Sequence, residues 1–227
     1  MGWDSPTLSW EFGRLCTLST ILEERELDPP HWYGISNRRL FQEVPVSRYL
    51  TALFQSPAHL IQLREKDLPR EENRGLVRKG AQLASERGKI FLVNTDWELA
   101  IQERVDGAHL TSKQDLVAAC RLRTESGLQR FVLGQSVHSI PEAVCAERQG
   151  ADYVLLAPIF NPISKRPQGP ALGLAALQEA SESVSIPVFG LGGITHENAR
   201  QTIDTGAFGV AGISWVNDHV RRLLHAT

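Results

Sequence analysis

The chain has 227 residues, of which 42% are hydrophobic, and a formal net charge of −2. This length allows one large domain or two small ones, and the apolar content is sufficient for a full core. Without a global positive field the chain is not expected to bind nucleic acid or an anionic membrane, so any positive potential must be local.

Three cysteines, Cys16, Cys120 and Cys145, lie far apart and form no Cys-x-x-Cys pair. This spacing favours a reducing compartment and disfavours a zinc site or a disulfide framework. No run is apolar enough to span a bilayer, and the N-terminus lacks a basic start followed by an apolar signal core. We therefore predict a cytoplasmic protein.

Residues 1–31 lie outside any repeating pattern and end close to Pro29-Pro30. Two consecutive prolines cannot continue a helix or a central strand. We interpret this segment as an N-terminal extension of unknown role that packs on the following domain or frays. A misassigned start codon is the alternative.

From residue 32 to residue 227, short apolar runs alternate with amphipathic stretches, which is typical of repeated βα units. Strands are predicted at residues 33–36, 59–66, 89–94, 107–110, 131–137, 153–158, 187–192 and 209–214. Helices are predicted between them, for example at residues 70–87, 141–149, 174–183 and 197–205. Eight such units indicate an α/β protein with a single (β/α)8 TIM barrel. A doubly wound sheet is the competitor, but residues 35–39 lack the Gly-rich turn that usually follows its first strand.

In a barrel of this kind the catalytic residues lie at the C-terminal ends of the strands. The polar residues at these predicted ends are Gln62, Arg64, Lys66, Asn94, His109, Ser136 and His138, and the loop after the sixth strand adds Ser164, Lys165 and Arg166. Side chains alternate along a strand, so Gln62, Arg64 and Lys66 are expected on one face. If that face is buried, the two cations need an anion; an edge strand with solvated charges is the alternative.

Glycines are concentrated at the ends of the last two predicted strands. Gly190-Leu191-Gly192-Gly193 ends the seventh strand, and Gly212-Ile213-Ser214 ends the eighth. Barrels often bind phosphate there with backbone N–H groups and a helix N-terminus. Together with the cations, these glycines predict a phosphorylated ligand.

The strand-end motifs also occur in an order that is found in one family. They are Trp32-Tyr33-Gly34-Ile35-Ser36-Asn37-Arg38, Gln62-Leu63-Arg64-Glu65-Lys66, Val93-Asn94, Gly107-Ala108-His109-Leu110, Gly134-Gln135-Ser136-Val137-His138-Ser139, Gly150-Ala151-Asp152-Tyr153-Val154, Pro158-Ile159-Phe160 and Gly190-Leu191-Gly192-Gly193-Ile194-Thr195. The chain resembles the thiamine phosphate synthase and TenI superfamily of thiamine-biosynthesis barrels over nearly everything after residue 31.

The synthase branch of this superfamily joins a hydroxymethylpyrimidine diphosphate to a thiazole phosphate and releases pyrophosphate with the help of magnesium. The resemblance implies a pyrimidine contact for Gln62 and a place near the reaction centre for Ser136. It implies a diphosphate site made of Arg64, Lys66, Asn94 and Lys165. It also implies a thiazole phosphate site made of Ser164, the Gly192-Gly193 turn, Ile213 and Ser214.

The sequence departs from the synthase pattern at its two magnesium ligands. Where that pattern has aspartates, this chain has Thr95 and Gln114, and neither replaces the carboxylate that Mg²⁺ prefers. Asp96 and Asp115 each lie one residue later. On the first turn of a helix a one-residue shift rotates the side chain by about 100°, so a rescue of the metal site is the less favoured alternative.

The TenI branch consists of thiazole tautomerases that work without metal and use a histidine in a Ser-Val-His-Ser context. Residues 136–139 match that context, so His138 is a candidate general acid and base. Because the magnesium ligands are missing, we expect a TenI-like tautomerase without a cofactor. The alternatives are a synthase, for which Mg²⁺ would be required, and a non-catalytic protein that binds thiamine intermediates. Phosphorylated thiazole or pyrimidine substrates are the expected partners, and a homo-oligomer is left open.

Overall fold

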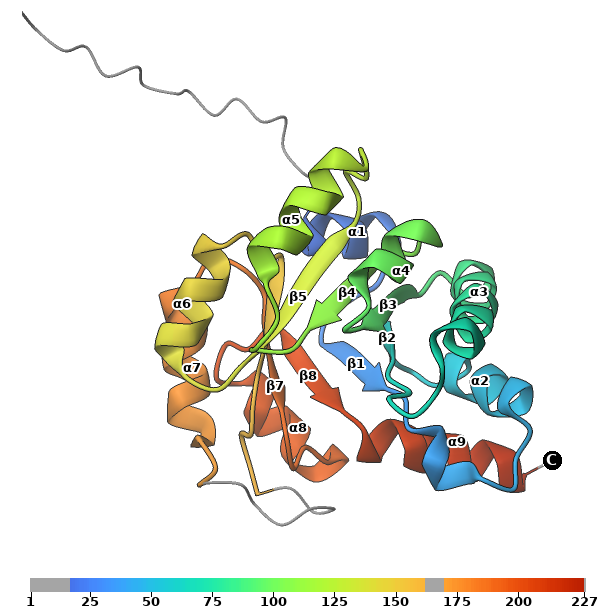
Figure 1. Ribbon diagram of the computed structural model, residues 1–227. Coiled ribbons are helices and arrows are strands. Elements are labelled where there is room, and N and C mark those ends of the chain that lie inside the picture. Colours follow the sequence, from blue (N-terminus) through green and yellow to red (C-terminus); the bar gives the residue numbers. More distant parts are fainter. Residues whose placement is uncertain (1–16, 162–169, 227) are drawn as a thin grey trace, which may run out of the picture.

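Eight parallel strands form a closed barrel in which each strand pairs with its two neighbours in chain order (Figure 1). The computed structural model describes residues 17–161 and 170–226. The strands are β1 (His31–Ile35), β2 (Leu60–Leu63), β3 (Ile90–Asn94), β4 (Gly107–Leu110), β5 (Val132–Val137), β6 (Tyr153–Leu156), β7 (Val188–Leu191) and β8 (Gly209–Gly212). The (β/α)8 barrel predicted from the alternating sequence pattern is therefore confirmed.

Helices surround this barrel and connect its strands (Figure 1). They are α2 (Val46–Phe54), α3 (Arg70–Glu86), α4 (Trp97–Gln102), α5 (Leu116–Glu125), α6 (Ile140–Arg148), α7 (Gly173–Ser183), α8 (His196–Ile203) and α9 (Ser214–His225), with a short 3₁₀ helix, η1 (Arg38–Phe41), after β1. Among the described helices, none is long and apolar enough to cross a membrane.

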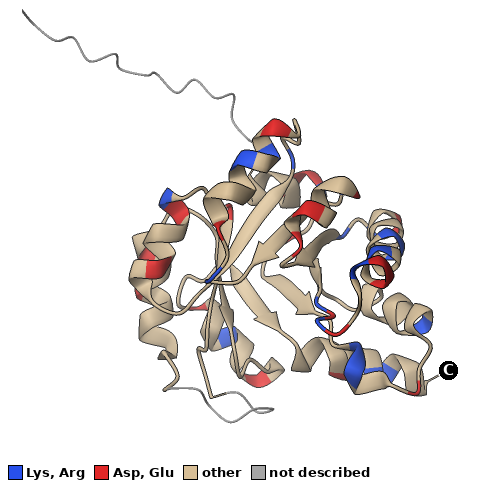
Figure 2. Cartoon of the chain, in the orientation of Figure 1, with Lys and Arg blue, Asp and Glu red and all other residues tan. Residues whose placement is uncertain are grey.

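The charge pattern explains why these segments become strands and helices. In the part of the chain that the structure describes, the eight strands contain no Asp, Glu, Lys or Arg. Parallel strands are buried on both faces, which requires such uncharged runs. Figure 2 shows the charged residues on the helices and loops instead, with both signs interspersed.

The core has two shells. The larger shell lies between the strands and the surrounding helices and includes Phe54, Phe91 and Val216. The smaller shell fills the barrel interior and includes Tyr33, Tyr153 and Phe189. Both shells are almost completely excluded from solvent, as a filled barrel requires.

Part of the predicted N-terminal extension closes one end of the barrel. Helix α1 (Leu18–Glu24) begins after the N-cap Thr17, and its residues Leu18, Ile21 and Leu22 join the inner shell. Arg25, which follows the helix, forms an ion pair with Asp106 immediately before β4. The strands begin at this end, so the opposite end is left as the mouth of the barrel.

One layer of inward-facing residues in the barrel includes a glycine whose lack of a side chain makes room for a neighbour. Asn94, His109, Gly134 and Tyr153 are in register across β3, β4, β5 and β6. A Cβ atom on Gly134 would lie 2.0 Å from the Cζ atom of Tyr153, so the tyrosine ring occupies the place of the absent side chain. The glycine is therefore required for the tyrosine to enter the barrel.

We expect Gly134→Ala to destabilise the fold by about 3 kcal/mol, because overpacking a rigid core forces backbone and ring displacements. Urea unfolding measures this as a lower midpoint at unchanged slope. The matched control is Gly75→Ala on α3, where an added Cβ meets nothing within 4 Å. This control should stabilise the protein by about 0.5–1 kcal/mol, since Gly is unfavourable inside a helix. A Gly134→Ala variant as stable as the wild type would contradict the packing described here.

Candidate active site

Two amides meet at the mouth of the barrel, at the ends of β2 and β3. Gln62 Nε2 donates a hydrogen bond of 2.7 Å to Asn94 Oδ1. Both side chains are buried, with exposures of 1% for Gln62 and 8% for Asn94. Gln62 Oε1 has no hydrogen-bond partner among the described residues. A buried acceptor without a partner is costly, so a ligand donor is expected to satisfy it.

The predicted strand at residues 59–66 is wrong at its C-terminal end, because β2 stops at Leu63 and both Arg64 and Lys66 lie in the following loop. In this loop the Glu65 side chain is buried beside the end of β1. Its Oε1 accepts a hydrogen bond of 2.6 Å from Ser36 Oγ, and the same Ser36 Oγ accepts one of 2.8 Å from the Arg64 backbone N–H. Arg38 also donates its backbone N–H to the Glu65 carboxylate.

This anchoring determines where the loop cations lie. Glu65 is 7% exposed, whereas Lys66 is exposed and Arg64 is half-buried. Burial raises the pKa of the Glu65 carboxyl, and its hydrogen bonds from Ser36 and Arg38 oppose that shift. Burial lowers the pKa of Arg64, while the nearby Glu65 charge raises it. Among the described residues the Arg64 guanidinium has no ion-pair partner within 4.0 Å, so an anionic ligand there would compensate its desolvation.

A third polar group lies between β4 and β5. His109 Nε2 is 2.8 Å from Ser136 Oγ, and His109 Nδ1 is 3.1 Å from the hydroxyl of Tyr153. Ser136 is partly exposed, while His109 is buried. Burial, assisted by the positive charge of Arg64, lowers the pKa of His109 to about 3. The sequence indicated Ser136 and His109, but it gave no reason to include Tyr153 or its neighbour Tyr33.

His138 lies just beyond the end of β5 and is exposed. Its Nδ1 is 2.8 Å from the backbone carbonyl oxygen of Ala157. A carbonyl can only accept, so in the neutral ring Nδ1 carries the proton and Nε2 keeps a lone pair. Its Nε2 is thus able to accept a proton from a ligand.

The predicted phosphate contacts lie in the turn after β7 and at the start of α9 after β8. After β7, Gly192 and Gly193 have φ of 99° and 64°, and a Cβ on Gly193 would lie 2.7 Å from the carbonyl oxygen of Asn161. After β8, Ile213 is the N-cap of α9, which begins at Ser214. Within residues 17–161 and 170–226 no side chain caps this helix, so its first N–H groups are available to an anion. The other predicted phosphate contacts, Ser164 and Lys165, lie outside the described residues.

Thr95 and Gln114, which replace the magnesium-binding aspartates of the synthase pattern, are hydrogen-bonded to each other. Gln114 Nε2 donates to the Thr95 carbonyl oxygen at 2.9 Å, and Gln114 Oε1 accepts from the Thr111 backbone N–H at 2.9 Å. Thr95 also has a φ of 65°, which is unusual for a β-branched residue.

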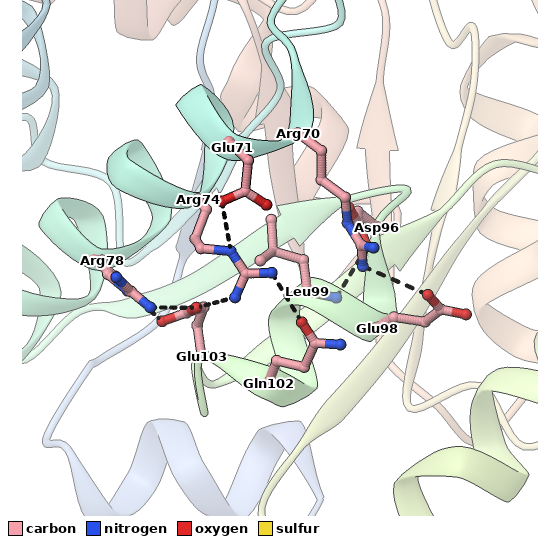
Figure 3. A network of polar contacts seen from close by, with 9 residues as sticks. All are labelled: Arg70, Glu71, Arg74, Arg78, Asp96, Glu98, Leu99, Gln102 and Glu103. Carbon is pink, nitrogen blue, oxygen red and sulfur yellow. Dashed lines mark hydrogen bonds and ion pairs between the residues drawn. The ribbon is translucent and has the colours of Figure 1, made fainter.

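The neighbouring aspartates have other roles. Asp115 Oδ1 accepts a hydrogen bond from the Ala118 N–H and so caps α5. Asp96 caps α4 through the Leu99 N–H and forms an ion pair with Arg70 on α3, as Figure 3 shows. Across the described residues there is no group of three or more His, Cys, Asp or Glu that could hold a metal ion. These residues do not fit the two-carboxylate magnesium site that the family resemblance implies.

Comparisons with known proteins identify the family of this barrel. The model of the family described as "Thiamine monophosphate synthase" matches residues 32–216. A relative named "Putative thiamine-phosphate synthase 2" from Aquifex aeolicus is 35% identical over 188 residues, which cover 83% of this chain and 98% of the relative. A relative named "Thiamine-phosphate synthase" from Methanoculleus marisnigri is 40% identical over 159 residues, which cover 70% of this chain and 74% of the relative.

A solved structure supports the same assignment. The thiamine phosphate pyrophosphorylase from Pyrococcus furiosus superposes with a TM-score of 0.71 at 29% identity, covering 86% of this chain and 96% of that one. The names of these relatives favour the synthase alternative over the tautomerase that the sequence departures led us to expect. By family, fold and strand-end motifs, the chain belongs to the thiamine phosphate synthase and TenI family of thiamine-biosynthesis enzymes.

Proposed function

We propose that this protein is a thiamine phosphate synthase. In this reaction the thiazole nitrogen of a thiazole phosphate forms a bond to the methylene carbon of a hydroxymethylpyrimidine diphosphate. The bond from that carbon to the diphosphate oxygen breaks, and pyrophosphate leaves. The relatives carry this name, and the observation that carries the proposal is the buried Gln62–Asn94 pair, with the half-buried Arg64 two residues after Gln62.

The amide pair suits the pyrimidine end of the substrate. The unpartnered Gln62 Oε1 is an acceptor, and the amino group of an aminopyrimidine is a donor. Asn94 Oδ1 holds the Gln62 amide in place through the 2.7 Å hydrogen bond. A tautomerase that handles only a thiazole has less reason to keep this pair.

The loop after β2 suits the diphosphate. Arg64 is half-buried and remains cationic, because a guanidinium begins from a very high pKa. Lys66 lies two residues later on the same Glu65-anchored loop, at the solvent side. Since the residues at positions 95 and 114 do not fit a metal, we assign no step to magnesium. The charge on the departing pyrophosphate falls to Arg64, Lys66 and, outside the described residues, Lys165.

The glycine-rich turns suit the thiazole phosphate. Gly193 brings its backbone close to the loop after β6, and the uncapped N-terminus of α9 at Ser214 attracts an anion. Both turns lie at the C-terminal ends of β7 and β8, where barrels commonly bind phosphate. The two substrates would then meet near Ser136.

We expect the protein to convert the two substrates to thiamine phosphate and pyrophosphate in equal amounts. The change Arg64→Met should lower kcat/KM for the pyrimidine diphosphate about 100-fold, the usual cost of removing a charged group that stabilises a developing anion. Coupled detection of pyrophosphate measures this. The matched control is Arg39→Met on η1, an exposed arginine that should leave the rate unchanged. No product formation, or an Arg64→Met variant with full activity, would contradict the synthase assignment.

The missing carboxylates generate a second prediction. The double change Thr95→Asp and Gln114→Asp should create magnesium binding that is detectable by calorimetry, because Mg²⁺ is held by one or two carboxylates. Asp tolerates the positive φ at position 95. The uncharged control, Thr95→Asn with Gln114→Asn, should bind no more magnesium than the wild type. Equal binding by both double variants would show that the charge at these positions is irrelevant.

A second candidate function is supported by His138, whose Nε2 lone pair is available to a ligand. If the protein isomerises a thiazole carboxylate phosphate, His138→Ala should reduce that rate by about 100-fold or more, the usual contribution of a general acid and base. His225→Ala, an exposed histidine at the end of α9, is the control. If His138→Ala loses isomerisation but still forms thiamine phosphate, the wild-type protein has both activities. Tight binding of the phosphate esters without turnover in either assay would favour the non-catalytic alternative.

A further inference from the structure

Four polar side chains form a continuous line from the mouth of the barrel into its interior. Ser136 Oγ lies 2.8 Å from His109 Nε2, and His109 Nδ1 lies 3.1 Å from the Tyr153 hydroxyl. The Tyr153 hydroxyl lies 3.0 Å from that of Tyr33. The four residues come from β5, β4, β6 and β1, so the line crosses the barrel.

The inner end of this line is closed. Tyr33 is 0% exposed and belongs to the inner apolar shell. Its ring packs edge-on against Phe189, and within the described residues its hydroxyl has Tyr153 as its sole hydrogen-bond partner. The outer end is open, because Ser136 is partly exposed at the mouth.

His109 contributes a single N–H to this line. Burial and the charge of Arg64 hold its pKa at about 3, so the ring is neutral at physiological pH. A neutral imidazole has one donor and one acceptor nitrogen. The position of its proton therefore decides the direction of every hydrogen bond in the line.

Only one arrangement pairs every buried hydrogen. If Tyr33 donates to Tyr153, then Tyr153 can donate to His109 Nδ1, and His109 Nε2–H donates to Ser136 Oγ. The hydroxyl hydrogen of Ser136 then points to the open mouth. In the reverse arrangement Ser136 donates to Nε2 and Nδ1–H donates to Tyr153, which leaves the Tyr33 hydrogen buried without an acceptor. An unpaired buried donor is strongly disfavoured.

We infer that the Tyr153 hydroxyl, at the buried side of this line, holds His109 as its Nε2–H tautomer and thereby makes Ser136 a hydrogen-bond donor toward the barrel mouth. His109 is then a positioning residue, and it cannot act as a base toward Ser136, because its nitrogen on that side already carries the proton. Ser136 binds an acceptor atom of the substrate, a phosphate oxygen or a ring nitrogen, and does not act as a nucleophile. The role of Ser136 in binding rests on the proposed function, whereas the tautomer does not.

The tautomer can be measured in the ligand-free wild-type protein by long-range ¹H–¹⁵N NMR correlation after ¹⁵N-histidine labelling. The His109 resonances are assigned by their displacement in Ser136→Ala and their loss in His109→Gln. We expect an unprotonated Nδ1 and a protonated Nε2 at neutral pH. A protonated Nδ1, or a comparable mixture of both tautomers, would overturn the inference. Because no substrate is present, this result is independent of whether the synthase assignment holds.

Two tyrosine variants separate this role from simple packing. In Tyr33→Phe, Tyr153 becomes the closed end and its hydrogen must still go to Nδ1, so the tautomer should persist and kcat should change less than twofold. In Tyr153→Phe, His109 Nδ1 loses the hydroxyl that orients the ring, so we expect kcat to fall about tenfold while KM changes little. A Tyr153→Phe variant that keeps the wild-type kcat would refute the role of Tyr153.

Discussion

The packing of the Tyr153 ring over Gly134 connects the interior of this barrel to its mouth. Because no side chain projects from Gly134, the Tyr153 ring fits inside the barrel. Its hydroxyl lies between the hydroxyl of Tyr33 and the imidazole of His109. Tyr153 belongs to the inner apolar shell and also contacts His109, which in turn contacts Ser136 at the mouth. The same burial that stabilises the barrel holds the histidine neutral and fixes which of its atoms can donate.

A second constraint acts on the loop after β2. Glu65 is buried, and the hydrogen bonds that its carboxylate accepts from Ser36 and Arg38 tie the ends of β1 and β2 together. Arg64 is thereby held half-buried with its charge uncompensated by any described ion pair. A carboxylate buried with several donors makes a rigid support, so the cations need little reorganisation when an anion binds.

The eight βα units were predictable from sequence because parallel strands must be uncharged on both faces, and the alternation of apolar runs with charged helices reports this directly. The end of β2 was not predictable, since the loop that follows it is held by Ser36, a residue directly after β1. For the same reason the sequence indicated Ser136 and His109 at strand ends but not Tyr33 and Tyr153. Those tyrosines lie within apolar strands, and only the register across the barrel brings their hydroxyls together. The orientation of Asp96 likewise depends on Arg70, which belongs to α3.

Thr95 and Gln114, which stand where the family pattern has metal ligands, are joined by a hydrogen bond in this chain. Thr95 at a positive φ is a strained conformation that costs on the order of 1–3 kcal/mol, and it persists only where its surroundings support it. Here the Thr95 N–H donates to the His109 carbonyl, and Gln114 donates to the Thr95 carbonyl. Residues 95 and 114 are therefore coupled, and they link the ends of β3 and β4 beside His109. If the protein is the synthase proposed above, these positions contribute rigidity, and Arg64 on the anchored loop contributes positive charge.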